Sequence, residues 1–214
     1  MATKPTPGGS GRPAAGTRPG AGRAVRADAR RNRARVLEVA IEAFATEGLS
    51  LPVHEIARRA GVGTGTVSRH FPTKESLFEA IVFSFAERLV EQARQLAATE
   101  DPGTAFFGFF SAMVGEGAAN RALADALAGA GFDVEAAASR AEHDVMGALR
   151  DLLARAQQAG AVRGDVDVAD VKALMVGCLA RERPGGDAHA RDRMLAVVCE
   201  GLRADRREVR AHPS

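Results

Sequence analysis

The sequence contains no tryptophan and no tyrosine, so its aromatic residues apart from histidine are ten phenylalanines. β-Branched and aromatic residues are too thinly spread for a sheet-rich protein, whereas the abundant Ala, Leu, Arg and Glu favour helix. We find no internal repeat and no alternating run long enough for a convincing strand. The composition therefore predicts an all-α protein, and 214 residues suffice for one or two domains with a hydrophobic core.

Long apolar runs are also missing, since no stretch approaches the ~18–20 apolar residues of a membrane span. The N-terminus lacks the apolar core of a secretory signal. The chain has only two cysteines, Cys178 and Cys199, and both lie in apolar helical contexts. Such cysteines are typical of buried free thiols in a reducing compartment, with a redox pair as the alternative. We therefore expect a cytoplasmic protein without a membrane partner.

Catalytic signatures are missing as well. The chain has five histidines, and they lack the spacing of metal ligands: His54, His70, His143, His189 and His212. No nucleophile–base motif is present. We expect no catalytic residue, no metal, no cofactor and no enzymatic activity.

Charge is distributed unevenly along the chain. The first 35 residues hold nine Lys or Arg and a single acid, Asp28, which gives them a net charge of +8. The remainder must then carry −6 to give the whole chain its +2. A basic end on an acidic body suggests a polyanionic partner at that end. Residues 1–25 lack periodicity and are rich in Gly, Pro and Arg, which predicts a disordered basic arm; residues 206–214 are expected to form a disordered tail.

Helical periodicity and capping residues divide the rest of the chain into about nine helices. The first begins near Arg26. Thr64 is predicted to cap a short helix that ends at Phe71, because Pro72 disfavours helical backbone in the residue before it. Asp133 is predicted to cap one long helix through about Ala159. Further predicted caps and breaks are Thr73, Asp167 and the "RPGGD" segment, residues 183–187.

The segment "GVGTGTVSRHF", residues 61–71, supports two interpretations. A nucleotide-binding G-x-G-x-x-G loop would need its third glycine where Thr66 stands, and it should follow a strand. The preceding "PVHEIARRA" has helical spacing instead. The alternative is a DNA-binding helix-turn-helix, in which Gly61 makes the turn and Val67 packs back against the preceding helix. Gly65 inside a helix is unfavourable by about 1 kcal/mol relative to Ala, and close approach to DNA would account for it.

Two longer stretches of the sequence strengthen the helix-turn-helix interpretation. They are "RRNRARVLEVAIEAFATEGL", residues 30–49, and "EIARRAGVGTGTVSRHFPTKESLFEAI", residues 55–81. They contain the spacings F-x-x-x-G, A-x-x-A-G-V and H-F-x-x-K-x-x-L. Together they resemble the DNA-binding domain of the tetracycline-repressor (TetR) family of transcriptional regulators. The resemblance covers about a quarter of the chain; beyond it, only the all-helical layout and the length are similar.

This resemblance implies an N-terminal three-helix DNA-binding domain, residues 26–72, and a helical effector-binding and dimerisation domain, residues 73–205. The residue types and the family pattern together give these candidate DNA contacts: Arg26, Arg30, Arg31, Thr64, Gly65, Thr66, Ser68, Arg69, His70 and Lys74. Arg69 suits a guanine edge or a phosphate, and His70 suits a phosphate or a place in the core. Ser68 departs from the family, which usually has an aromatic residue there that contacts the DNA backbone.

The middle of the chain is unusually apolar, above all in "AFFGFFSAMV", residues 105–114. The resemblance places an effector cavity among these helices, and a well-packed core is the alternative. The tentative ligand-binding residues are Phe106, Phe109, Phe110, Met113, Phe132, His143 and Met146. The last two helices would form a homodimer interface or pack within one subunit. The predicted function is a DNA-binding repressor released from its operator by a small molecule; the alternative is a helical small-molecule-binding protein without regulatory DNA binding.

Overall fold

The computed structural model describes residues 19–180 and 188–204, with side chains from Asp28 to Ala180 and from His189 to Ala204. Most of the predicted basic arm (residues 1–18), the predicted break at residues 183–187 and the tail 206–214 lie outside the described residues. The described part contains ten helices and no strand; two residues, Val162 and Arg203, form an isolated β-bridge. The prediction of an all-α fold is therefore confirmed, with one helix more than the expected nine or so.

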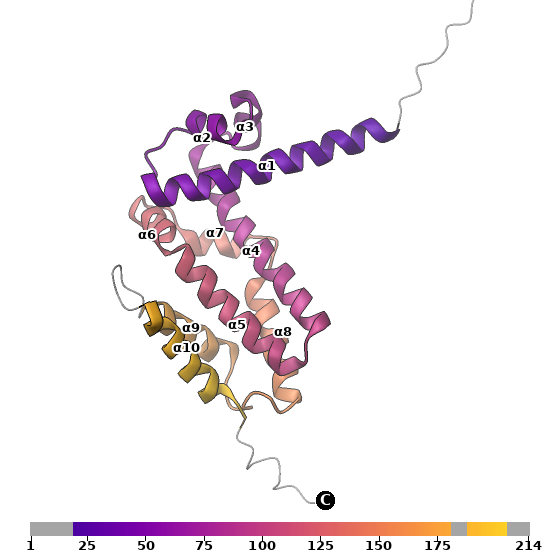
Figure 1. Cartoon of the computed structure of the whole chain (residues 1–214), viewed down its shortest axis with the longest axis vertical. Helices are drawn as coiled ribbons and strands as arrows, with labels where there is room; N and C mark the ends of the chain where they lie inside the picture. The colour runs from indigo at the N-terminus through magenta and orange to yellow at the C-terminus, as the bar shows by residue number, and fades with distance from the viewer. Residues whose placement is uncertain (1–18, 181–187, 205–214) are drawn as a thin grey trace, which may run out of the picture.

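The ten helices form an N-terminal group, α1 to α3, a long connecting helix, α4, and a body built from the remainder (Figure 1). Their bounds are α1 Pro19–Glu47, α2 Val53–Ala60, α3 Thr64–His70, α4 Lys74–Thr99, α5 Pro102–Ala119, α6 Arg121–Gly129, α7 Val134–Arg140, α8 Val145–Gln158, α9 Val168–Ala180 and α10 Ala188–Leu202. Helix α1 begins at Pro19, seven residues before the expected start at Arg26. Residues 19–25, assigned from sequence to the disordered arm, are thus helical.

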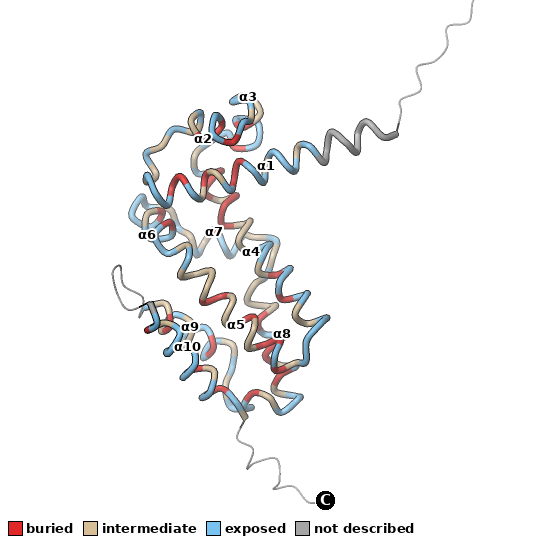
Figure 2. Tube along the Cα trace, in the orientation of Figure 1, coloured by how far each residue is buried: buried red, intermediate tan, exposed pale blue. Residues whose placement is uncertain are grey.

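The N-terminal group has its own apolar core (Figure 2). Phe44 of α1 meets Phe78 of α4 edge-to-face, with ring centroids 5.4 Å apart. Ile56 and Ala57 of α2 are fully buried, and Val67 of α3 is 1% exposed. The small Ala57 lets the two short helices approach closely, and Val67 packs in the same cluster as α2, as the sequence predicted.

Local chemistry sets the ends of these helices. Gly61 terminates α2 with φ +65°, a left-handed conformation that favours glycine. The Thr73 hydroxyl accepts a hydrogen bond from the Ser76 amide, and the Ser76 hydroxyl accepts one from the Thr73 amide, a reciprocal capping box that starts α4. The predicted cap at Thr64 is wrong by one residue: Gly63 is the N-cap and Thr64 is the first helical residue.

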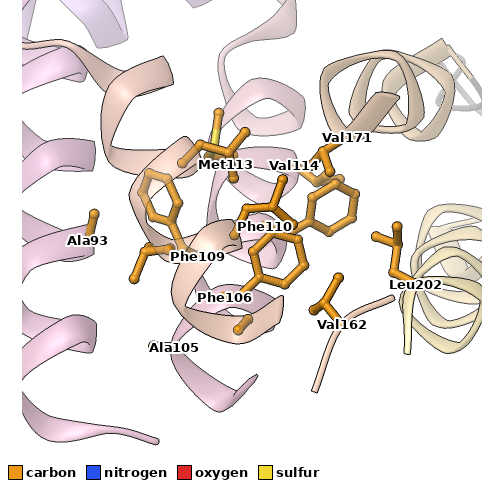
Figure 3. Packing of buried hydrophobic residues seen from close by; sticks show 14 of the residues in the cluster. Ala93, Ala105, Phe106, Phe109, Phe110, Met113, Val114, Val162, Val171 and Leu202 are labelled. Carbon is orange, nitrogen blue, oxygen red and sulfur yellow. The ribbon is translucent and has the colours of Figure 1, made fainter. Parts of the chain in front are cut away.

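The body packs α4, α5, α8 and α9 around a second core. The rings of Phe106, Phe109 and Phe110 on α5 are fully buried there, and Figure 3 shows them among Val114, Val162, Val171 and Leu202. Val114 belongs to α5 itself, and Val162 lies in the connection that follows α8. Val171 belongs to α9 and Leu202 to α10, so this core joins the last two helices to the middle of the body.

One predicted helix is two helices in the structure. The expected continuous helix from Asp133 to about Ala159 is interrupted at residues 141–144, where Ala141 adopts an extended conformation with φ −62° and ψ 140°. Asp133 caps α7 as predicted, by accepting a hydrogen bond from the Ala136 amide. The interruption arises because Asp144 is a second N-cap, whose side chain accepts from the Gly147 amide and begins α8.

Candidate functional site

Helix α3 presents a face of small, polar and basic side chains. Thr64, Gly65, Ser68, Arg69 and His70 are all exposed, and Thr66 is half-buried. The opposite side of the helix is held by the buried Val67. Arg69 forms no hydrogen bond or ion pair with any other residue in the described part of the chain, which leaves its guanidinium available to a partner. The structure thus brings six of the predicted DNA contacts together on one short helix.

Packing within the protein does not require glycine at position 65. A Cβ built on Gly65 has no atom within 4 Å, and the residue is exposed. Its φ is not in the left-handed region, so backbone conformation does not require glycine either. Neither packing nor backbone conformation within the described part of the protein accounts for this glycine.

Two further predicted contacts lie beside α3. The His70 side chain is exposed, with its ring centroid 6.2 Å from that of Phe71. Lys74 begins α4, and its Nζ lies 5.7 Å from the centroid of the Phe44 ring. The first turn of α4, in which Lys74 is half-buried and Glu75 is exposed, combines this ammonium with helix amide groups, a combination that suits a phosphate.

The predicted contacts in the basic arm lie on α1. Arg30 and Arg31 are exposed, and Arg31 is paired with Asp28 one turn earlier. The backbone of Arg26 is helical, but its side chain lies outside the described residues. These positions continue α1 beyond the compact N-terminal group (Figure 1).

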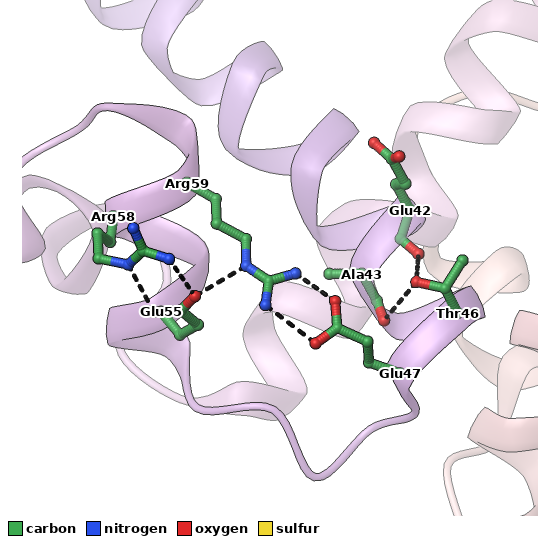
Figure 4. A network of polar contacts seen from close by, with 7 residues as sticks. All are labelled: Glu42, Ala43, Thr46, Glu47, Glu55, Arg58 and Arg59. Carbon is green, nitrogen blue, oxygen red and sulfur yellow. Dashed lines mark hydrogen bonds and ion pairs between the residues drawn. The ribbon is translucent and has the colours of Figure 1, made fainter.

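An ion-pair network braces α2 against the end of α1 (Figure 4). Arg59 Nε donates to Glu55 at 2.9 Å, and its guanidinium also pairs with Glu47 of α1. Arg58 donates twice to Glu55, at 2.7 and 2.8 Å. Hydrogen bonds from Arg58 and Arg59 lower the pKa of Glu55 from its ordinary 4.5 to about 2. Sequence reasoning missed this network. The i, i+3 and i, i+4 spacings in "EIARR" indicate the pairs of Glu55 with Arg58 and Arg59 within α2, but they do not indicate the pair with Glu47.

A cavity of about 620 Å³ lies next to the core of the N-terminal group, between α4, α6, α7 and the start of α8. Its lining is mainly apolar, and it includes two of the predicted ligand-binding residues, His143 and Met146. The other predicted residues lie elsewhere. Phe106, Phe109, Phe110 and Met113 are packed in the body core, and Phe132 packs on Phe78 with centroids 5.6 Å apart.

The cavity shares a wall with the core of the N-terminal group. Leu123 and Leu127 of α6 and Val134 of α7 line the cavity, and the same side chains pack in the cluster that contains Phe44, Ile56 and Phe78: the two leucines are buried within it and Val134 packs against it. Sequence reasoning did not select these residues. The four-residue spacing of Leu123 and Leu127 indicates a buried helix face. The spacing does not indicate that this face lies between a cavity and the core of the N-terminal group.

Helix α7 is tied to two different elements by charge. Glu135 accepts from Lys172 Nζ of α9 at 3.2 Å, and Arg140 donates to Glu79 of α4 at 2.7 Å. Both Glu135 and Lys172 also line the cavity. One short helix thus connects the cavity with the helix that leaves α3 and with one of the last two helices.

The last two helices carry exposed apolar side chains. Val176 on α9 is 53% exposed, and Met194 and Val197 on α10 are 37% and 70% exposed. Large apolar side chains at such exposure are unfavourable in water unless another surface covers them. The two cysteines lie on the other sides of these helices: Cys178 is buried and Cys199 is half-buried, and burial raises the pKa of both thiols.

Two other kinds of site are absent from the described residues. None of the helices there combines the length and the apolar character needed to cross a bilayer. Nor do three or more His, Cys, Asp or Glu side chains gather there in a way that would hold a metal ion.

Comparison with known proteins gives two family matches. Residues 36–81 match the family model for bacterial regulatory proteins of the tetR family, and residues 101–204 match that of the SbtR-like transcriptional regulator C-terminal domain. A TetR regulator of Mycobacterium vanbaalenii of known structure is 51% identical, with 84% of this chain and 99% of that chain aligned and a TM-score of 0.69. The chain belongs to the TetR family. Membership confirms the prediction of a transcriptional regulator of this class rather than an enzyme.

Two further regulators differ in how far the similarity extends. The regulator SCO0520 of Streptomyces coelicolor is 34% identical over 80% of this chain and 98% of its own, with a TM-score of 0.66. The HTH-type regulator SAUSA300_2515 of Staphylococcus aureus is 41% identical over 54 residues only. That alignment spans 29% of the Staphylococcus protein's length and 25% of this chain, so the similarity covers only a part of each protein.

Proposed function

We propose that this TetR-family chain is a homodimeric repressor that acts in the cytoplasm, binds operator DNA through α3 and is released by a small-molecule effector. The observation that carries this proposal is the cavity wall formed by Leu123, Leu127 and Val134, which is also part of the core that supports α3. A molecule in the cavity contacts side chains on which the position of α3 depends.

DNA binding is assigned to the exposed face of α3 and to its surroundings. Arg69 is free to pair with a guanine edge or a phosphate, and the threonines and Ser68 are small enough to enter a major groove. We assign Lys74 and His70 to phosphates at the edges of that groove, and Arg30 and Arg31 extend the positive charge along α1. Ser68 contributes a hydroxyl donor in place of the aromatic ring usual in the family, so contact with the DNA backbone at that point is polar.

Dimerisation is assigned to the exposed apolar face of α9 and α10. A two-fold dimer would cover Val176, Met194 and Val197 with their counterparts and present two α3 helices to half-sites about 34–36 Å apart. We place the division between the two functional parts near residues 72 and 73, with the first turns of α4 packed in the N-terminal core.

Release is assigned to the cavity. An effector favours the DNA-free arrangement only if it binds that arrangement more tightly than the DNA-bound one. The shared wall and the Arg140–Glu79 ion pair are contacts that a second position of α4 would have to change.

The test begins with purified full-length protein and genomic fragments, from which bound sequences are selected. On the selected site we expect Arg69→Ala to weaken binding by about 1–3 kcal/mol, measured by fluorescence anisotropy. Arg150→Ala is the matched control, because Arg150 is an exposed arginine on α8, away from α3. Equal losses for both variants, or no selective enrichment of any fragment, would contradict the proposal.

A further inference from the structure

The cavity adjoins a second, polar hollow. A groove of about 470 Å³ runs between α4 and α8 and is lined by their facing side chains. His143 and Asp144, in the connection between α7 and α8, line both the cavity and the groove. The cavity and the groove therefore meet at this connection.

The cations around the two hollows already have partners. Lys172 is paired with Glu135 at 3.2 Å, and Arg94 with Glu91 at 3.7 Å. Arg155 Nη2 donates to the Ala97 carbonyl near the C-terminus of α4, at 3.2 Å. An anionic group on a ligand would have to compete for each of them.

The carboxylates of the groove are in a different situation. Asp144 accepts from the Gly147 amide at 2.7 Å as the cap of α8. Glu142 and Asp151 are exposed and form no hydrogen bond or ion pair with any residue that the structure describes. The lining of both hollows holds four carboxylates, Glu135, Glu142, Asp144 and Asp151, against the three cations, which leaves a net charge of −1 with His143 neutral. The excess charge is thus negative, and it lies on the two carboxylates without partners.

We propose that the effector is an amphipathic organic cation. Its apolar body lies in the cavity, against Phe85, Leu123 and Leu127, and its positive end lies in the groove against Glu142 and Asp151. A volume of 620 Å³ falls within the range of about 300–1,000 Å³ that is usual for small-molecule sites. This proposal rests on the proposed role of the cavity as the effector site, and it adds the chemical class of the ligand.

A matched series of probes tests it. Octyltrimethylammonium, 1-octanol and octyl sulfate share one apolar chain and differ in the charge of the end group. Binding to the full-length protein is measured by isothermal titration calorimetry below the concentration at which each probe forms micelles. We expect the cation to bind at least fivefold more tightly than the alcohol and the sulfate to bind most weakly, because one partly solvated contact between unit charges is worth about a factor of five to ten.

Variants of the two carboxylates separate charge from fit. The double variant Glu142→Gln/Asp151→Asn should bind octyltrimethylammonium about fivefold to tenfold more weakly and leave the affinity for 1-octanol unchanged. Glu87→Gln is the matched control, because Glu87 is an exposed acid on α4 that lines neither hollow. Thermal melting of each variant confirms that the fold is retained.

The outcomes distinguish this inference from the function on which it rests. If the cation and the alcohol bind equally and the double variant changes neither, the cavity is an apolar binding site and the assignment of a cationic effector is overturned. If none of the three probes binds, the cavity is not an effector site, and the proposed mechanism of release fails with it.

Discussion

Gly65→Ala is a change for which the structure predicts opposite effects on stability and on DNA binding. The added methyl group has no atom of the protein within 4 Å, and the backbone at this position is ordinary right-handed helix in α3. The substitution therefore introduces neither a clash nor strain within the protein. It reduces the conformational freedom of the unfolded chain, which destabilises the unfolded state relative to the folded one.

The expected magnitudes follow from these two facts. A compatible Gly-to-Ala change raises the free energy of unfolding by about 0.4–1 kcal/mol, which for a chain of this length raises the melting temperature by roughly 1–4 °C. If α3 lies against DNA at Gly65, the same methyl group overfills the contact and weakens binding by roughly 1–3 kcal/mol. That loss corresponds to roughly a five- to 150-fold higher Kd.

Two measurements on one preparation decide the matter. Thermal unfolding by circular dichroism gives the change in stability, and fluorescence anisotropy on the selected operator gives the change in affinity. Gly115→Ala is the control, because Gly115 lies inside α5, its added Cβ also meets no atom within 4 Å, and it is remote from α3. A Gly65→Ala protein with unchanged affinity would refute the reasoning that glycine is present for close approach to DNA, and a lowered melting temperature would refute the packing argument.

Three further predictions concern the interface, the brace and the phosphate contacts. Val197→Glu should convert the dimer to a monomer by placing charge in the apolar face, which light scattering after size exclusion would detect; an unchanged mass would exclude α10 from the interface. Because the pKa of Glu55 is depressed from 4.5 to about 2 in the folded state, its stabilising contribution is complete above pH 4.5 and is lost as the pH falls through 2. The melting temperature of Glu55→Gln should therefore lie below the parent's at pH 7, with the gap closing towards pH 2, and a constant gap would argue against the ion-pair origin. Lys74→Ala should reduce the slope of log affinity against log salt by about 0.9 for each half-site, or about 1.8 for a dimer on its operator, and an unchanged slope would mean that Lys74 neutralises no phosphate.

Much of the N-terminal group is predictable from sequence because its signals are local. A glycine at the end of α2, a threonine before α4 and a proline after α3 each act within a few residues, and the structure places Gly61, Thr73 and Pro72 in those roles. The cap of α3 was misplaced by one residue because Gly63 and Thr64 both suit an N-terminus, and only the backbone angles distinguish them.

The body is less predictable because its decisive contacts are between distant segments. Phe132 has the same local character as the phenylalanines of α5, yet it packs on Phe78 in the other core, 54 residues away in the sequence. Asp144 interrupts a segment whose apolar periodicity is continuous. The sequence does not identify this aspartate as a cap, because an aspartate in such a pattern can be a surface residue or a cap. The cavity lies between α4, α6, α7 and the start of α8, so its walls come from segments whose mutual contacts periodicity does not reveal.

The shared wall also limits how this regulator can acquire a new ligand. A substitution at Leu123 or Leu127 changes the shape of the cavity and also disturbs the core in which α3 packs. Such a substitution therefore affects the cavity and the position of α3 together. Val145 and Met146, which line the cavity from the start of α8, do not pack in the core of the N-terminal group. New ligand preferences should therefore arise first on the α8 side, where a change in chemistry leaves operator recognition intact.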